Sequence, residues 1–357
     1  MFVKQNSETV GWRKEVEDVF EDACGEQCPF TIQVFCPAFA LNDIKVHFRP
    51  EYSAQTHPDP RVRESIQTEW LQRKRENPNL FDGSKFRFHS LADTENVNDF
   101  KSIFNLGLTS YGEFLGTNYG PLAPTLRADG LQSEHKLSQA YFSDPLGVGV
   151  YLTTTDGYVV CIERSQAVGE FCGYIDAPGG HPEPNKVWDP RYKDKGDGNL
   201  EKNFFLCRAE EATDLTFPVD YTELSPLQYE DMENRIRNEL FNSIVEEICD
   251  ETNIPKSCLN WNSEQKCMGL IAIIRQTAAY GRPSLLFRMA CTLTKEQVSA
   301  EYNRGAKEAF ETTRLHFFKD EVKHPYDIPN LPGKQFTPAC TAMFAAVSKY
   351  QERAAAF

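Results

Sequence analysis

The chain has 357 residues, of which 40% are apolar and 25% are charged, as in an ordinary soluble globular protein with a full hydrophobic core. Its formal net charge of −14 repels the phosphates of nucleic acids and acidic membrane surfaces, so we expect neither as a partner. The 11 cysteines form no disulfide framework, and neither a signal peptide nor a membrane-spanning apolar run is visible. We therefore expect a cytoplasmic location, with the nucleus as the alternative.

The first part of the chain mixes strand and helix patterns. Residues 60–74 have the charge density of a surface helix, with Val62, Ile66 and Trp70 on one stripe. Residues 105–120 contain too much Gly and Thr for a long helix. Alternating patterns predict strands at 31–38, 44–48 and 85–91. We interpret residues 1–140 as a smaller α+β domain.

The sequence pattern changes after Asp144-Pro145, and we interpret residues 141–357 as a second domain. A hairpin is predicted about Asp156-Gly157, followed by a short strand that leads into Pro178-Gly179-Gly180. Residues 184–229 are polar, so a long insertion is expected at about 185–228. A helix is predicted at 231–252, and it should end at Asn253 and Pro255. The remaining predicted elements are strands at 146–152, 158–162, 172–176, 268–275, 284–293 and 313–318, and helices at 295–302 and 340–353.

The end of the predicted long helix is acidic and reads VEEICDETNIP at residues 245–255. Glu247 and Glu251 are one turn apart, Asp250 shares their face, and Glu239 lies two turns earlier. Like charges at this spacing, close to the negative end of the helix dipole, destabilise the helix unless a cation offsets them. Hard carboxylate oxygens select Mg²⁺ or Mn²⁺ over zinc. The alternative interpretation is a solvated acidic surface.

A glycine pair precedes this helix in the segment YIDAPGGHPEP, residues 174–184. Glycine has no Cβ, so its backbone can pass close to a phosphate or a metal. The two segments together resemble the Nudix box, a Gly-Gly loop followed by a helix that ends in a glutamate cluster. By this resemblance Gly180 is the leading glycine, Glu183 is the acidic loop position, Glu247 is the first catalytic-helix glutamate, and Asp250 and Glu251 are the Glu-Glu pair.

Three features depart from the box. Glu246 stands where the box has arginine, so we expect Arg235 or Arg237 to orient the glutamates instead. The segment between loop and helix is longer by some tens of residues. Glu239 is one residue out of register with the earlier glutamate of the box.

Strings both outside and within the box resemble the animal Nudix hydrolases that cleave UDP-glucose and UDP-galactose. They are KFRFHS, LGLTSYGEFLGTN, SDPLGVG, DAPGGHPEP, EICDETNIP and GRPSLLFRMACTLTKEQV, within about residues 60–320. The resemblance implies an α/β fold, a Nudix α/β/α sandwich with a mixed sheet, preceded by a smaller α+β N-terminal domain. It also implies water attack on the diphosphate of a small nucleotide-sugar, with Mg²⁺ (or Mn²⁺), giving UMP and a sugar 1-phosphate.

The resemblance implies roles for the acidic residues. Glu247 and Glu251 would hold the metal, Asp250 would be a further ligand, and Glu239 a more distant candidate. The general base would be Glu247, Glu251 or Glu183, between which the sequence does not choose.

Substrate contacts are expected from residues of the glycine loop and of the first domain. Gly179, Gly180 and His181 would lie against phosphate, and Arg87 would attract the diphosphate. Tyr111, Thr117 and Asn118 could contact uracil or ribose. The alternatives are an incidental loop histidine, a solvated strand face for Arg87, and a turn that holds the two domains together for residues 111–118. Gly281-Arg282-Pro283 is interpreted as a hairpin turn.

Two other functions stay open from the sequence. One is a different Nudix specificity, such as ADP-ribose, coenzyme A or capped RNA. The other is a nucleotide-binding regulator that has kept the fold and lost catalysis, which the missing box arginine would favour. The oligomeric state is open too.

Overall fold

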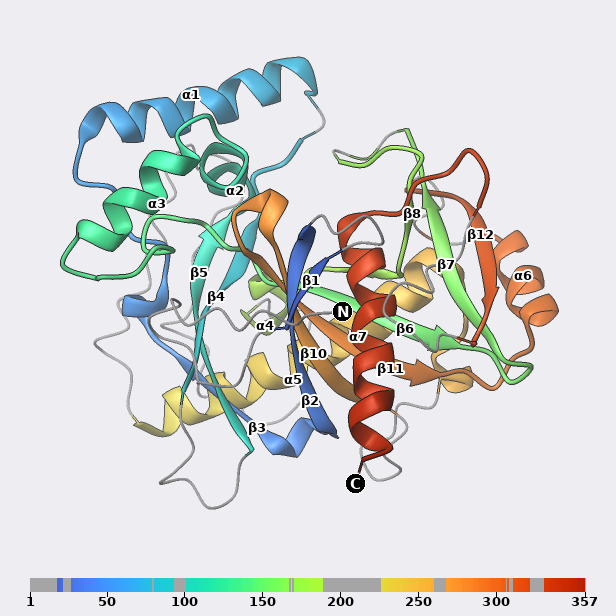
Figure 1. Cartoon of the computed structure of the whole chain (residues 1–357). Coiled ribbons are helices and arrows are strands. Elements are labelled where there is room, and N and C mark those ends of the chain that lie inside the picture. Colours follow the sequence, from blue (N-terminus) through green and yellow to red (C-terminus); the bar gives the residue numbers. More distant parts are fainter. Residues whose placement is uncertain are drawn as a thin grey trace.

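The computed structural model describes residues 18–21, 27–78, 80–92, 101–166, 168, 170–188, 226–259, 268–305, 307, 311–321 and 331–356. These residues form two sheets with helices packed against them, so the fold is mixed α/β (Figure 1). The middle of the expected insertion, residues 189–225, lies outside the described residues.

The larger sheet has nine strands and lies at the centre of the molecule (Figure 1). Its path runs β1-β2-β10-β11-β6-β7-β12, with β8 paired to β7 and β9 paired to β6. The β11–β6 pairing is parallel and the other pairings are antiparallel, so the sheet is mixed, as predicted. The strands are β1 (Asp18–Glu21), β2 (Gln27–Phe39), β6 (Gly147–Thr153), β7 (Tyr158–Arg164), β8 (Ile175–Asp176), β9 (Gly179–Gly180), β10 (Met268–Gln276), β11 (Arg282–Ala290) and β12 (Thr312–Lys319).

The smaller sheet has the order β3-β5-β4 and lies beside helices α1, α2 and α3 (Figure 1). Its strands are β3 (Ile44–Phe48), β4 (Ser84–Ala92) and β5 (Ser102–Ser110), and the helices are α1 (Pro60–Glu76), α2 (Tyr111–Thr117) and α3 (Ala123–Gln132). β1 and β2 belong to the larger sheet although they precede residue 140. The strand pairing therefore does not follow a boundary at that residue.

Two long helices cover opposite faces of the larger sheet. The buried side of α5 (Pro226–Thr252) packs in one core cluster with Val148 and Val150 of β6. The next residue, Tyr151, packs in a second cluster with α7 (Pro338–Ala354). Neighbouring strand residues point to opposite faces, so β6 contributes to both cores. Figure 1 shows α7 in front of the sheet and α5 behind it.

Most predicted elements occur, with shifted ends. The predicted helix at 231–252 begins five residues earlier, at Pro226. It ends as predicted, because Asn253 takes a left-handed conformation with φ of 57° and Pro255 follows. The predicted loop from residue 184 begins instead with the helix α4 (Pro184–Trp188). The remaining elements are α6 (Lys295–Asn303) and the short 3-10 helices Leu41–Asp43, Pro50–Tyr52, Lys256–Cys258 and Thr277–Ala279. Within the described part of the chain, no helix is both long and apolar enough to cross a membrane.

Candidate active site

The glycine pair and the acidic helix end meet in the structure, although some 70 residues separate them in the chain. β9 is held against β6 by the pairings Val148–Gly180 and Gly149–Gly179. The amide of Gly179 donates a hydrogen bond of 2.9 Å to Oε2 of Glu251. A Cβ on Gly180 would lie 2.0 Å from Oε1 of Glu247. Only glycine leaves room for the Glu247 carboxylate at this strand.

Glu251 is buried, with 3% of its surface exposed. The alternative interpretation of a solvated acidic surface therefore does not hold for Glu251, because the last turn of α5 lies against the glycine strand. Burial raises the pKa of Glu251 well above its usual value, and the nearby Glu247 raises it further. The amide of Gly179 acts in the opposite direction, since it stabilises the ionised form. A bound cation would favour both carboxylates in their charged state.

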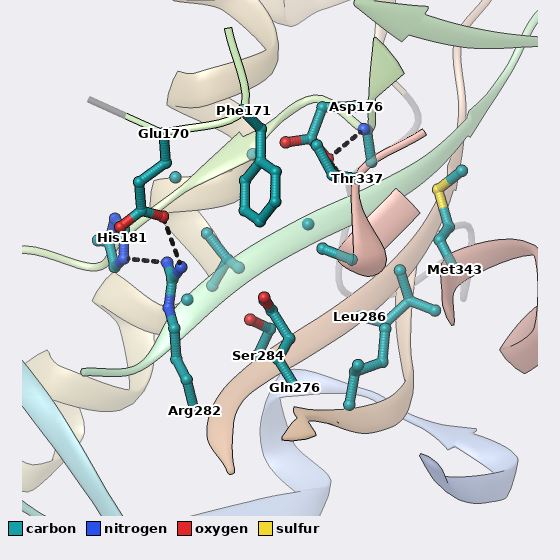
Figure 2. A pocket seen from close by; sticks show the side chains of 18 of the residues that line it. Glu170, Phe171, Asp176, His181, Gln276, Arg282, Ser284, Leu286, Thr337 and Met343 are labelled. Atoms are coloured by element: carbon teal, nitrogen blue, oxygen red, sulfur yellow. Dashed lines mark hydrogen bonds and ion pairs between the residues drawn. The ribbon is translucent and has the colours of Figure 1, made fainter. Parts of the chain in front are cut away.

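A cavity of about 220 Å³ lies on the other side of the glycine strand, and Gly179, Gly180 and His181 line it. In Figure 2, Arg282 stands between His181 and Glu170. Its guanidinium donates to Nε2 of His181 at 2.6 Å and lies 3.7 Å from the Glu170 carboxylate. Burial and Arg282 hold the pKa of His181 well below its usual value, so its ring is neutral. The predicted hairpin turn is present, since β10 and β11 pair antiparallel up to Gln276 and Arg282, but the Arg282 side chain also faces the cavity.

The other walls combine aromatic and polar groups. Phe171 and Tyr111 supply rings, and burial raises the pKa of the Tyr111 hydroxyl to about 12, so it stays protonated. The side chains of Gln276 and Ser284 are buried beside the cavity, and no described residue forms a hydrogen bond with either. Opposite them, the Thr337 hydroxyl donates to Asp176 at 2.6 Å (Figure 2). The cavity therefore offers free polar groups next to aromatic surface.

Relatives of the chain identify the family, although no family model matches it. The uridine diphosphate glucose pyrophosphatase NUDT22 of Homo sapiens is 34% identical over 294 residues, which are 82% of this chain and 83% of that protein. Its Mus musculus counterpart is 33% identical over 294 residues, 82% of each chain. Nudix hydrolase 9 of Arabidopsis thaliana is 28% identical over 315 residues, 85% of this chain and 87% of that protein. The chain belongs to the Nudix hydrolase family. It is an enzyme of the Nudix hydrolase type.

Lysines, not the expected arginines, face the acidic groups of this Nudix hydrolase. Arg235 pairs with Asp231 at 2.8 Å, and Arg237 approaches only the carbonyl of Ile44, at 3.5 Å. The prediction that either arginine orients the glutamates is wrong. Lys186 of α4 instead binds Glu246, the residue at the arginine position of the box, at 2.7 Å.

A second lysine, Lys85 of β4, comes from the other sheet. Its ammonium group lies 3.9 Å from Glu183, and burial lowers its pKa while Glu183 and Glu247 raise it. Glu183 also has Lys186 at 4.0 Å. Glu183 therefore lies between two lysines, beside α5, and does not line the cavity. Its role as general base stays a prediction.

Asp250 and Glu239 have partners of their own. The carboxylate of Asp250 forms an ion pair with Lys307. Glu239 is 8% exposed and accepts a hydrogen bond of 3.1 Å from the amide of Glu183. Burial raises the pKa of Glu239 to about 7. Glu239 thus fixes the chain that follows the glycine strand, and the metal roles of both residues stay predictions.

Arg87, Thr117 and Asn118 do not reach the cavity. Arg87 is 1% exposed, and its guanidinium donates to three backbone carbonyls, those of Tyr52, Gln139 and Phe142. The side-chain amide of Asn118 donates to Asp144 and to the carbonyl of Ala279, and the Thr117 hydroxyl donates to the carbonyl of Glu113. The expectation of substrate contacts is corrected, because Arg87 binds buried backbone carbonyls near β4, and Thr117 and Asn118 form their bonds at the end of α2.

No sequence motif indicates the other residues that line the cavity, among them Arg164, Glu170, Phe171, Gln276 and Ser284. They come from separate strands and turns and form no local motif. Adjacent strand pairing places Ser284 of β11 opposite Gly147 of β6. Only the tertiary fold brings these side chains together.

The carboxylates suit a hard divalent cation that is shared with a substrate. Across the described ranges, no group of three or more His, Cys, Asp or Glu side chains is arranged as a complete metal site. Mg²⁺ usually keeps several waters and needs only one or two protein carboxylates when substrate phosphates complete its shell. Glu247 and Glu251, next to a strand without side chains, fit that requirement.

Proposed function

We propose that this Nudix hydrolase cleaves the diphosphate of UDP-sugars, UDP-glucose and UDP-galactose, into UMP and a sugar 1-phosphate. The observation that carries the proposal is the Gly179-Gly180 strand, which borders the cavity on one side and contacts Glu247 and Glu251 on the other. A diphosphate on this strand would meet both features. Relatives named uridine diphosphate glucose pyrophosphatase support the substrate class.

The catalytic part of the proposal rests on Glu247 and Glu251, which would hold Mg²⁺, or Mn²⁺ in its place. A divalent ion in such a site neutralises charge on diphosphate oxygens and lowers the pKa of a bound water. The Gly179 amide keeps Glu251 in place. The glycines let diphosphate oxygens approach the backbone, because no Cβ projects from either residue.

We assign the nucleoside to the cavity. The rings of Phe171 and Tyr111 can lie against a base, and the unpartnered amide of Gln276 can pair with the edge of uracil. Arg282 supplies a positive charge toward the phosphates, and the neutral His181 that it contacts can accept or donate a hydrogen bond. Gln276 takes the place in the proposal that the sequence had suggested for Asn118.

The fold of the family supports the same assignment. We infer that the larger sheet, with α5 and α7 on its two faces, is the Nudix α/β/α sandwich. The smaller sheet with α1, α2 and α3 would then be the N-terminal addition. Tyr111 begins α2, so the addition contributes one wall of the substrate cavity.

A substrate panel tests the proposal. Phosphate release after coupling to a phosphatase is measured for UDP-glucose, UDP-galactose, ADP-ribose and GDP-mannose, each with and without Mg²⁺. We expect UDP-sugars to have the highest kcat/KM by a factor of tenfold or more, a size that unpaired buried groups can produce. Gln276→Ala should reduce this preference, whereas Asn118→Ala, outside the cavity, should not change it in protein that melts normally. Equal kcat/KM across the four compounds would show that only the diphosphate is recognised.

A further inference from the structure

A second cavity, of about 640 Å³, lies behind helix α2, and nothing in the proposed reaction uses it. Tyr111 and Phe114 of α2 line the cavity of the candidate active site, whereas Gly112, Glu113 and Thr117 line the second one. The two cavities are therefore on different sides of one helix. A ligand in the second cavity would not occupy the substrate position.

Aromatic rings and two carboxylates line the second cavity. His57, Trp70, Phe81 and Tyr141 supply the rings, and Phe81 is 73% exposed at the rim. Two carboxylates, those of Asp82 and Glu113, face the same space. This combination of an apolar lining with a few convergent polar groups is typical of small-molecule sites.

The two carboxylates lack a cationic partner. Within the described ranges, neither Asp82 nor Glu113 has a Lys, Arg or His close enough for an ion pair. Glu113 accepts one hydrogen bond from the Thr109 hydroxyl at 3.0 Å, and Asp82 accepts one from the amide of Gly112. Burial raises the pKa of Glu113, and Asp82 raises it further as a neighbouring negative charge. The described residues therefore supply no ion-pair partner for either carboxylate when it is ionised.

The basic groups that border the cavity are already bound to other atoms. Arg63 donates to the carbonyls of His57 and Pro58, and Lys74 donates to the carbonyls of Pro78 and Leu80. Arg87 does not line the cavity, and its guanidinium donates to three carbonyls, although its charge lowers the pKa of Glu113.

His57 is also engaged on both ring nitrogens. Its Nδ1 accepts from the amide of Asp59, and its Nε2 donates to Asp129 at 3.2 Å. A ligand would therefore have to bring the missing positive charge itself.

We propose that this cavity binds a small organic cation, a primary ammonium group attached to an aromatic or other apolar body. The ammonium group donates charge-assisted hydrogen bonds to Glu113 and Asp82, which are the strongest type available at such a site. The apolar body lies among Trp70, Tyr141 and Phe81, and these rings also attract the cation. The proposal does not depend on which substrate the active site cleaves.

Three probes of similar shape test the charge requirement. Binding of 2-phenylethylamine, 2-phenylethanol and 3-phenylpropanoate to the full chain is measured by isothermal titration calorimetry at neutral pH. We expect the amine to bind roughly tenfold or more tightly than the neutral alcohol, as for loss of a charge-assisted hydrogen bond, and the carboxylate not to bind. Equal affinities for the amine and the alcohol would overturn the proposal. Absence of amine binding at concentrations up to about 10 mM would also overturn it.

Variants assign the effect to this cavity. Glu113→Gln keeps an acceptor for Thr109 but removes the charge, so the amine should lose most of its advantage over the alcohol. Glu64→Gln, on the exposed side of α1, is the matched control and should bind as wild type does. Asp82→Asn, which keeps an acceptor for Gly112, replaces Glu113→Gln if the latter does not melt cooperatively. An unchanged amine preference in a folded variant of either acid would overturn the proposal.

Discussion

The replacement Gly180→Ala tests the contact between the glycine strand and the catalytic helix. The new Cβ would lie 2.0 Å from Oε1, 2.4 Å from Cδ and 2.8 Å from Oε2 of Glu247. Ordinary contacts of a Cβ begin at 3.4 Å, so the nearest oxygen must withdraw by 1.4 Å, the difference between 3.4 and 2.0. Gly180 does not have a positive φ, so the alanine backbone itself is unstrained.

The expected loss falls on catalysis and not on folding. A displacement of about 1 Å in a positioned group can cost on the order of 10²-fold in rate, so kcat/KM should fall by about 10²–10³. That range corresponds to roughly 2.7–4 kcal/mol of transition-state stabilisation. The clash is with the end of a flexible side chain, and alanine restricts the unfolded chain more than glycine does. We therefore expect the free energy of unfolding to change by less than about 1 kcal/mol.

The assay compares kcat/KM for UDP-glucose and urea denaturation of the wild type, Gly180→Ala and Gly83→Ala. Gly83 is the matched control, because its added Cβ would meet only Phe81 ring carbons at 3.4 Å, an ordinary contact, and its φ is not positive either. Gly83→Ala should keep wild-type activity. If Gly180→Ala has wild-type kcat/KM and a normal melting curve, the close approach to Glu247 has no part in catalysis.

Three further predictions follow from the same residues and from one buried aspartate. Glu251→Gln and Glu247→Gln should each lower kcat by about 10²–10³. The melting temperature should not fall, because each replacement removes one of two neighbouring like charges. Wild-type kcat in either variant would refute the assignment of the metal site. Excess EDTA should abolish turnover, and activity in chelator would refute the metal. Burial raises the pKa of Asp144 from 3.8 to about 6, so the carboxyl binds its proton more tightly in the folded protein than in the unfolded chain. The stability of the wild type should fall relative to Asp144→Asn as pH rises through that window, by up to about 3 kcal/mol (about 2 units at 1.36 kcal/mol each). Urea denaturation at acidic and neutral pH measures the difference, and a change of the opposite sign would contradict it.

Periodicity predicted the elements that carry the site more accurately than it predicted the site itself. Ile236, Leu240, Ile244 and Ile248 recur at the i, i+4 spacing of one helix face and all four are buried, so this spacing alone indicates the helix and its buried side. Local spacing also placed Glu247 and Glu251 together. It could not show that Glu251 is buried, because the strand that covers it comes from residues 179–180, and no pattern within a helix reports what lies above it.

Residue type alone also led to wrong predictions for polar side chains that form hydrogen bonds with buried backbone groups. Arg87 alternates with aromatic residues in its strand, which resembles a solvated face, yet its guanidinium is buried because three carbonyls would otherwise lack donors. The amide of Asn118 is used in the same way, by Asp144 and by the carbonyl of Ala279. A polar side chain suited to a ligand is equally suited to a buried backbone, and only the fold decides between the two.

The departure from the Nudix box at Glu246 has a physical explanation in the structure. An arginine at this position would place a positive charge on the catalytic helix itself, whereas here the helix carries one more negative charge. Lys186 compensates by an ion pair of 2.7 Å with Glu246, and its own pKa is raised to a value well above normal by that carboxylate and its acidic neighbours. Lys85 adds a second positive charge, which acts on Glu247. In this chain the positive charge near the glutamates therefore comes from β4 and α4 and not from the helix itself. The arginine's absence is therefore no sign of lost catalysis, because positive charge still reaches the glutamates.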